Sequence, residues 1–82
     1  MGFREQAEQV LAALGGKDNI TDMEPCITRI RVEVVDKGKV DEAALRKAGA
    51  HGVMRMGNAI QVVMGPQADN IESEIRQLME GS

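Results

Sequence analysis

Residues 28–36 read Thr28-Arg29-Ile30-Arg31-Val32-Glu33-Val34-Val35-Asp36, which is the clearest strand pattern in the chain. Apolar side chains alternate with charged ones along this stretch. Successive side chains of a strand point to opposite faces of its sheet. The pattern therefore predicts a strand with one face in the core and one in water. Arg29 and Arg31 both fall on the wet face.

The single cysteine of the chain, Cys26, comes just before this strand and directly after Pro25. We expect Pro25 to stop a short strand over residues 20–23, which places Cys26 in the turn that follows. Nearby positive charge favours the nucleophilic thiolate, and guanidinium groups suit bidentate binding of phosphate. The backbone N–H groups of Ile27 and Thr28 would add donors for an anion. The stretch predicts that Cys26 is a nucleophile that carries a phosphoryl group.

Other interpretations of these residues remain open at this point. Cys26 could be a buried structural thiol, and the two arginines could be solvated charges on an exposed strand. His51 is the only histidine, and no spacing in the sequence brings it to Cys26 as a base. One cysteine and one histidine do not complete a zinc shell, and the glycines form no nucleotide-binding motif. We expect no metal and no cofactor.

The rest of the chain reads as alternating helices and strands. Helical spacing of apolar residues predicts a helix over residues 3–14, ended by Gly15-Gly16, and a polar loop over residues 17–19. Asp41 is a predicted N-cap for a helix through Ala48. Strands are expected over residues 52–56 and 59–64, joined in a hairpin by Gly57-Asn58. Gly65-Pro66 should begin a last helix with an apolar stripe.

This order predicts one α+β domain spanning residues 1–82. We expect a four-stranded, largely antiparallel sheet with three helices on one face, in the order α-β-β-α-β-β-α.

Composition narrows the class of partner. The 82-residue chain has a formal charge of −3 and one aromatic residue, Phe3, which argues against nucleic acid. It contains no apolar run long enough to insert into a membrane. One cysteine together with six methionines suits a reducing cytoplasm. The alternatives to a phosphoryl carrier are a nucleic-acid-binding module and a protein-interaction domain with a structural Cys26. We expect a monomer.

The chain resembles the IIB domain of the glucose family of the bacterial phosphoenolpyruvate:sugar phosphotransferase system. The resemblance rests on a core motif and on shorter matches along nearly the whole chain: Gly15-Gly16-Lys17-Asp18-Asn19-Ile20, Cys26-Ile27-Thr28-Arg29-Ile30-Arg31-Val32, Gly52-Val53, Ile60-Gln61-Val62, Gly65-Pro66 and Asp69-Asn70-Ile71.

The resemblance implies a mechanism and a set of partners. The IIB cysteine, here Cys26, accepts a phosphoryl group from a phosphohistidine of the IIA protein. It then passes the group to a sugar, N-acetylglucosamine or glucose, held by the membrane domain IIC. Ile27, Thr28, Arg29 and Arg31 are expected to bind the phosphoryl group, and Pro25, Ile27, Arg29 and Arg31 to contact the partners. The protein would work in the cytoplasm, at the inner face of the membrane through IIC.

Overall fold

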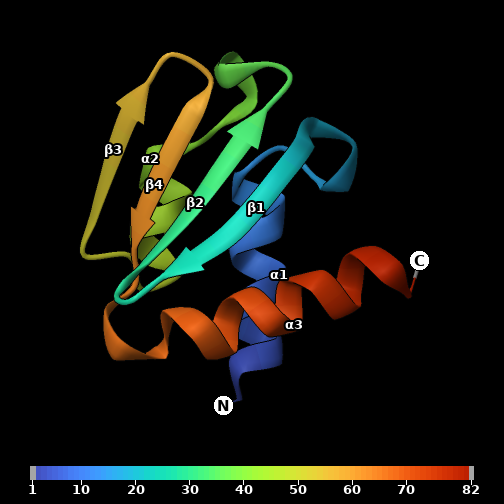
Figure 1. Ribbon diagram of the computed structural model, residues 1–82, viewed down its shortest axis with the longest axis vertical. Helices are drawn as coiled ribbons and strands as arrows, with labels where there is room; N and C mark the ends of the chain where they lie inside the picture. Colours follow the sequence, from blue (N-terminus) through green and yellow to red (C-terminus); the bar gives the residue numbers. More distant parts are fainter. Residues whose placement is uncertain (1, 82) are drawn as a thin grey trace.

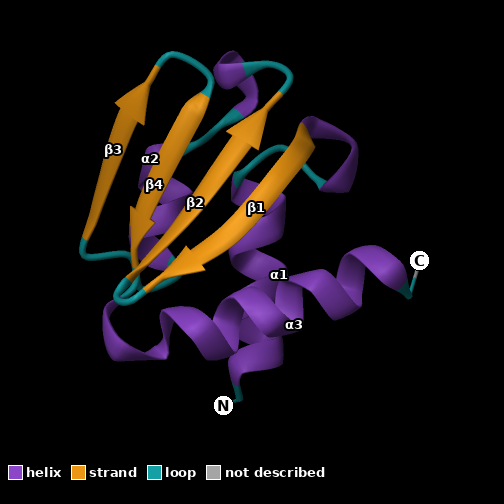
Figure 2. Cartoon of the chain, viewed as in Figure 1, coloured by secondary structure: helices purple, strands orange, loops and turns teal. Residues whose placement is uncertain are grey.

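The computed structural model describes residues 2–81 and has the predicted order of elements (Figure 2). Three short 3-10 turns, Lys17–Asn19, Lys37–Lys39 and Gly65–Gln67, lie between the main elements. The helices and strands are α1 (Phe3–Ala13), β1 (Ile20–Cys26), β2 (Arg29–Val34), α2 (Glu42–Lys47), β3 (Gly52–Met56), β4 (Ala59–Val63) and α3 (Ala68–Glu80).

The four strands form one antiparallel sheet in the order β1-β2-β4-β3. β1 and β3 are the edge strands. Figure 1 looks onto the face of the sheet that no helix of residues 2–81 covers, and α1 and α2 lie behind the strands. The predicted fold class is confirmed.

The core lies between the sheet and the helices. Ile30 and Val32 of β2 and Ile60 and Val62 of β4 are fully buried, as the alternating pattern predicts. The helices close this layer with fully buried side chains at helical spacing, namely Ala7, Val10, Leu45, Ala68, Ile71 and Ile75. Because apolar side chains occupy the inward-facing positions of each strand, the charged residues between them lie on the open face.

The prediction that Pro25 stops the first strand is wrong. β1 continues through Pro25 and ends at Cys26, and Pro25 lies opposite Ile30. In an antiparallel ladder, alternate residues of an edge strand direct their N–H groups away from the partner strand. Proline is tolerated at such a position because no ladder hydrogen bond is lost. Cys26 is therefore held in the ladder rather than in a loose turn.

The polar loop expected at residues 17–19 is instead a 3-10 turn with a buried side chain at its end. Asn19 is 3% exposed. Its Nδ2 donates to the carbonyl oxygens of Leu14 (2.8 Å) and Asp36 (3.0 Å), and its Oδ1 accepts from the Asp36 N–H at 2.9 Å. One side chain thus joins the end of α1 to the segment after β2, beside the start of β1.

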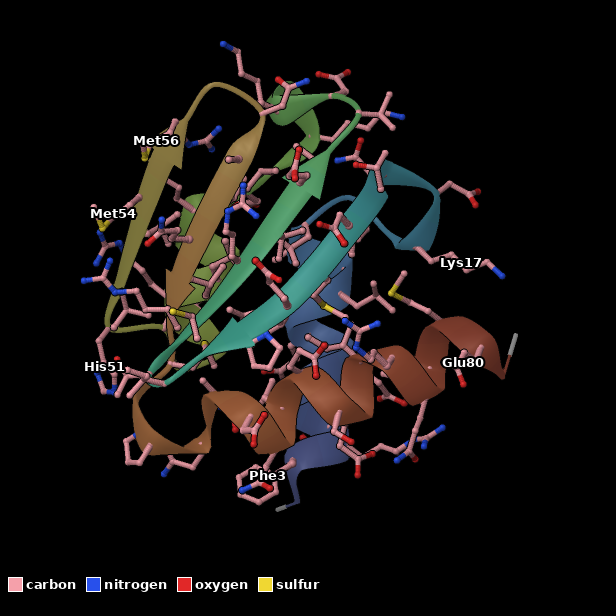
Figure 3. The ribbon with its side chains drawn as sticks, in the orientation of Figure 1. Phe3, Lys17, His51, Met54, Met56 and Glu80 are labelled. Carbon is pink, nitrogen blue, oxygen red and sulfur yellow. The ribbon has the colours of Figure 1, made fainter. Side chains whose placement is uncertain are left out.

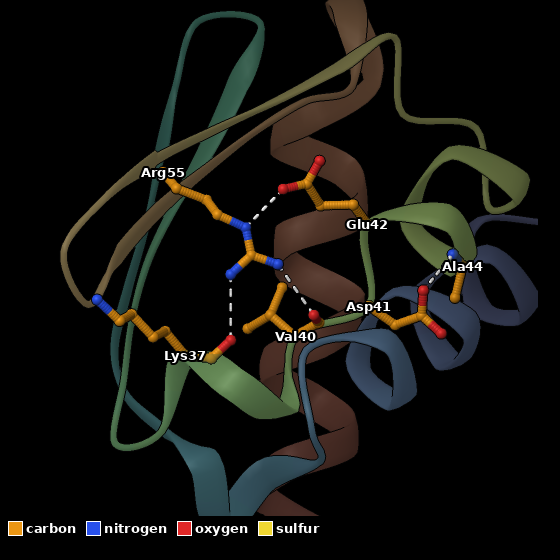
Figure 4. Close-up of polar contacts among 6 residues, drawn as sticks. All are labelled: Lys37, Val40, Asp41, Glu42, Ala44 and Arg55. Carbon is orange, nitrogen blue, oxygen red and sulfur yellow. Dashed lines mark hydrogen bonds and ion pairs between the residues drawn. The ribbon is translucent and has the colours of Figure 1, made fainter.

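The end of the sheet that carries the β3–β4 turn is called the far end below. It is fixed by polar contacts around Arg55 of β3 (Figure 4). Its guanidinium donates to Glu42 Oε1 at 2.5 Å and to the carbonyl oxygens of Lys37 and Val40 at 3.1 and 3.0 Å. Asp41 accepts from the Ala44 N–H at 3.1 Å, which confirms the predicted N-cap of α2. These contacts hold the segment between β2 and α2 against β3.

Within residues 2–81, none of the helices combines the length and the apolar character needed to cross a bilayer.

Candidate functional site: the turn between β1 and β2

Cys26 and Arg29 lie directly opposite each other at the closed end of the β1–β2 hairpin, with Ile27 and Thr28 between them as a two-residue turn. Residues directly opposite in an antiparallel pair share a face of the sheet. Arg29 alternates with the buried Ile30, so this face is the open one. Cys26 is exposed. The interpretation of Cys26 as a buried structural thiol is therefore wrong.

Ile27 has an unusual backbone conformation at the tip of this hairpin. It is the one non-glycine residue of residues 2–81 with a positive φ, at 57°. A β-branched residue in the left-handed region is a steric outlier and is most often found at functional sites. Its side chain is 89% exposed, so no burial compensates for the strain. The chain thus holds an apolar side chain out into solvent beside Cys26.

The turn is anchored on one side and open on the other. The Thr28 carbonyl oxygen accepts from the N–H groups of Met64 and Gly65, at 2.9 and 3.0 Å, which attaches the turn to the end of β4. Within residues 2–81, no hydrogen bond is formed by the backbone N–H of Ile27 or Thr28. Two donors at the tip of the hairpin are therefore available to a bound anion.

The Arg29 guanidinium is held by neutral groups. Its Nη1 donates to Gln61 Oε1 of β4 at 2.8 Å and lies 3.5 Å from the Met54 sulfur of β3. None of the ion pairs formed among residues 2–81 includes Arg29. Its positive charge has no carboxylate partner within these residues and lies over β4 and β3, on the side of β2 away from Cys26.

The Arg31 guanidinium has carboxylate partners on both sides. Nη1 lies 3.2 Å from Glu24 Oε1 of β1, and Nη2 lies 3.7 Å from Glu33 Oε2 of β2. These side chains are 41–58% exposed, and ion pairs in such positions are worth about 0–1 kcal/mol. Arg31 can therefore exchange these partners for another anion at little cost.

His51 lies at the same end of the sheet as the β1–β2 turn (Figure 3). Its backbone N–H donates to the Val63 carbonyl oxygen at 2.8 Å. Its ring lies against Gly65, since a Cβ built there would come 3.3 Å from His51 Nε2. The structure gives His51 no hydrogen bond to Cys26 among residues 2–81. The arrangement provides no Cys–His pair.

The sequence reasoning missed Gln61, Met54 and Glu24 as neighbours of the arginines. A polar Gln61 between the apolar Ile60 and Val62 indicates the wet face of its strand. The strand order brings it beside Arg29, and that order was not predicted. No cluster of three or more His, Cys, Asp or Glu side chains within residues 2–81 could hold a metal ion.

Comparisons with known proteins point to one family. A family model described as phosphotransferase system, EIIB, matches residues 8–41. The PTS system N-acetylglucosamine-specific EIIB component of Streptomyces coelicolor is 58% identical over 74 residues, covering 90% of this chain and 96% of that protein. A crystal structure of one domain of the PTS system IIabc component from Clostridium difficile shares the fold. It has a TM-score of 0.74 and 24% identity, over 96% of this chain and 80% of that one.

The chain belongs to the EIIB family of the phosphotransferase system, and the resemblance found in its sequence is confirmed. It is a component of a sugar phosphotransferase system. EIIB components work in general with IIA and IIC partners. The roles of the individual residues in this chain remain predictions.

Proposed function

We propose that Cys26 accepts a phosphoryl group from a phosphohistidine of a IIA protein and passes it to a sugar bound by a IIC domain. One observation carries the proposal. In a chain of the EIIB family, the only thiol is exposed at the closed end of a hairpin, directly opposite an arginine that has no carboxylate partner. An exposed thiol close to a cation is the environment typical of reactive cysteines, and Arg29 would supply that cation once it leaves Gln61 and Met54.

The two steps balance as phosphoryl transfers through a covalent carrier. In the first, the Cys26 thiolate attacks phosphorus, an S–P bond forms, the N–P bond of phosphohistidine breaks, and the histidine nitrogen leaves with the electron pair. In the second, a sugar hydroxyl attacks phosphorus and its proton passes to water, an O–P bond forms, and the S–P bond breaks to regenerate the thiolate. Splitting one transfer into two in this way is covalent catalysis.

The phosphoryl group would be bound by both backbone and side chains. The N–H groups of Ile27 and Thr28 are donors at the same end of the hairpin as Cys26, and the Arg29 guanidinium would join them by leaving Gln61 and Met54. Fixed donors that face the equatorial oxygens stabilise the charge of the transferring group. Arg31 supplies a second guanidinium when it leaves Glu24 and Glu33.

The contact surface for both partners would be centred on the turn. Ile27 extends an apolar side chain from the tip, Pro25 is exposed beside it, and Arg29 and Arg31 border the patch. Transient interfaces between carriers are small, and the domain offers an exposed hairpin end rather than a deep sugar pocket. The sugar itself would lie on IIC.

We propose N-acetylglucosamine as the sugar, because the Streptomyces coelicolor EIIB component named for that sugar is 58% identical over 90% of this chain. The proposed place of action is the cytoplasm, at the inner face of the membrane that holds IIC.

The decisive experiment is phosphoryl uptake measured by intact mass. The protein is incubated with phosphoenolpyruvate, the general phosphotransferase proteins and a IIA protein. We expect a gain of one phosphoryl group that is lost in Cys26→Ser. If the wild type takes up no phosphoryl group, or Cys26→Ser takes it up as well, the proposal is wrong. Chase with N-acetylglucosamine or glucose in IIC-containing vesicles then identifies the sugar.

A further inference from the structure

The Thr28 carbonyl oxygen accepts two backbone hydrogen bonds of different origin. The Met64 N–H donates to it at 2.9 Å and the Gly65 N–H at 3.0 Å. The first bond continues the ladder between β2 and β4 by one position, since the last pair of that ladder is Arg29 with Val63. The second lies outside the ladder, because successive N–H groups of an extended strand point to opposite edges. The chain after β4 therefore turns at this oxygen and holds it with two donors.

The second bond depends on the backbone conformation of Met64 and Gly65. Met64 has left the extended conformation, with φ −106° and ψ −6°. Gly65 has a φ of 83°, which a side chain on an L-residue disfavours. A residue that avoids this φ would rotate the peptide group that joins it to Met64. Because that peptide group carries the N–H bound to Thr28, the hydrogen bond and the positive φ are linked.

The space around Gly65 does not by itself require glycine. A Cβ there would lie 3.3 Å from His51 Nε2 and 3.4 Å from Gln67 Oε1, so these atoms would have to shift by a few tenths of an ångström. Both belong to exposed side chains, which can move by that amount. Pro66 follows and restricts the backbone of Gly65 further. The backbone conformation is therefore what requires glycine.

The bonds to Thr28 matter because its turn is strained. Ile27 combines a positive φ with an exposed side chain, and such a conformation persists only where the surrounding structure holds it. The pair of Cys26 with Arg29 closes the hairpin, and the Thr28 carbonyl attaches the turn to the end of β4. A two-residue turn has few free dihedrals, so fixing this carbonyl restricts the directions of the N–H groups of Ile27 and Thr28.

We propose that Gly65 is a positioning residue for phosphoryl transfer: its N–H holds the Thr28 carbonyl and so keeps the N–H groups of the turn in place for a phosphoryl group on Cys26. This inference rests on the proposed function and deepens it. Donors that are fixed before the reaction stabilise a transferring charge without reorganisation. With one of its two bonds to the end of β4 lost, the turn would have to be ordered during each transfer.

The test uses Gly65→Ala, with Gly16→Ala as the matched control. Gly16 has a φ of 90° and a Cβ there would meet nothing within 4 Å, so both variants introduce strain of the same kind. Gly16 precedes the start of β1, whereas Cys26 is the last residue of that strand. Phosphoryl uptake is measured in single turnovers over a range of phosphorylated IIA concentrations, at a temperature where thermal unfolding shows both variants to be folded.

We expect the maximal rate to fall roughly tenfold in Gly65→Ala, as for the loss of one hydrogen bond, and to keep its wild-type value in Gly16→Ala. The concentration of IIA at half-maximal rate should not account for the loss, because the Ile27 side chain is retained. A role of Gly65 in stability alone predicts wild-type rates for both folded variants.

A His51→Ala background separates the effect of the backbone from that of crowding. In this background Gly65→Ala should lower the maximal rate by the same factor as in the wild type, because the positive φ remains. Recovery of the rate would assign the loss to the contact between the new Cβ and His51, and would overturn the inference.

Amide proton NMR provides a readout at equilibrium. Phosphorylation of Cys26 should move the amide proton signals of Ile27 and Thr28 downfield, because these N–H groups then donate to charged oxygens. We expect this change to be smaller in Gly65→Ala and to be fully retained in Gly16→Ala.

Four further outcomes would each overturn the inference while the proposed function stands: a wild-type maximal rate in Gly65→Ala, an equal loss in Gly16→Ala, a change confined to the half-saturating IIA concentration, or wild-type amide shifts in phosphorylated Gly65→Ala. Phosphoryl uptake that does not depend on Cys26 would overturn the proposed function itself.

Discussion

The two hairpin turns, at opposite ends of the sheet, have the same length and different chemistry. The β3–β4 turn is Gly57-Asn58, and Gly57 has a left-handed φ of 64°. The β1–β2 turn is Ile27-Thr28, and Ile27 has nearly the same φ, 57°. Glycine adopts this conformation freely, whereas isoleucine adopts it at a cost of about 1–2 kcal/mol. One turn is built for stability and the other retains a strained, exposed apolar side chain.

The arginines at the two ends of the sheet also differ, in the groups to which their guanidinium groups donate hydrogen bonds. Arg55 donates to one carboxylate and two backbone carbonyl oxygens, so its donors are used to hold the fold. Arg29 donates to an amide and a thioether. A strained turn residue and an arginine without a carboxylate partner thus lie at the Cys26 end, whereas the turn at the far end has a glycine and Arg55 has a carboxylate partner.

The largest effect is expected for Arg29→Lys. Lysine keeps the charge and loses the planar fork, so the rate of phosphoryl transfer should fall about a hundredfold while the protein stays folded. Arg31→Lys should impair transfer in the same direction. Single-turnover transfer and thermal unfolding are the measurements, with the exposed Arg46→Lys as control. Wild-type transfer in both variants would remove these arginines from the mechanism.

Arg55→Met should have the reverse profile. Loss of its contacts to Glu42, Lys37 and Val40 should lower the free energy of unfolding by about 2 kcal/mol. Transfer by the folded protein should be unchanged, because Arg55 lies at the far end of the sheet. Urea unfolding measures the first quantity and single-turnover transfer the second. A slower transfer step in fully folded Arg55→Met would break the contrast between the two ends.

Gly57→Val introduces into the far turn the strain that the Cys26 turn already has. A Cβ at Gly57 would meet nothing within 4 Å, so the backbone conformation alone determines the cost. We expect the free energy of unfolding to fall by about 1 kcal/mol. Gly57→Asn is the control, since asparagine tolerates a left-handed φ. Equal stability of the two variants in urea unfolding would show that the turn relaxes to another conformation.

Ile27→Asn is the reciprocal change and the smallest expected effect on stability. Removing the β-branched side chain relieves the strain of the positive φ, which should raise the free energy of unfolding by about 0.5 kcal/mol. No burial is lost in return, because the isoleucine side chain is 89% exposed. Loss of the apolar contact should raise the concentration of IIA needed for half-maximal transfer. Val35→Asn, at another exposed apolar side chain, is the control. Unchanged stability together with unchanged half-saturation would argue against both roles of Ile27.

Much of the fold could be predicted from the sequence, because the signals are local. Alternation of Ile30, Val32 and Val34 with charged residues specified β2 and its buried face. Gly57-Asn58 specified the second hairpin, and Asp41 the start of α2. Pro25 was misread, because whether a proline interrupts a strand depends on which edge of the strand is paired, and that is not a local property.

The sequence alone determined that Cys26 is close to Arg29 and Arg31 and that both arginines lie on a wet face, since this follows from the period of a strand. Only the tertiary structure decided the order β1-β2-β4-β3, which places Gln61 and Met54 beside Arg29 and leaves Arg31 to Glu24 and Glu33. The physical reason is that a strand's pattern specifies its faces but not its neighbours. The neighbours determine whether a charge on that face is compensated by a carboxylate.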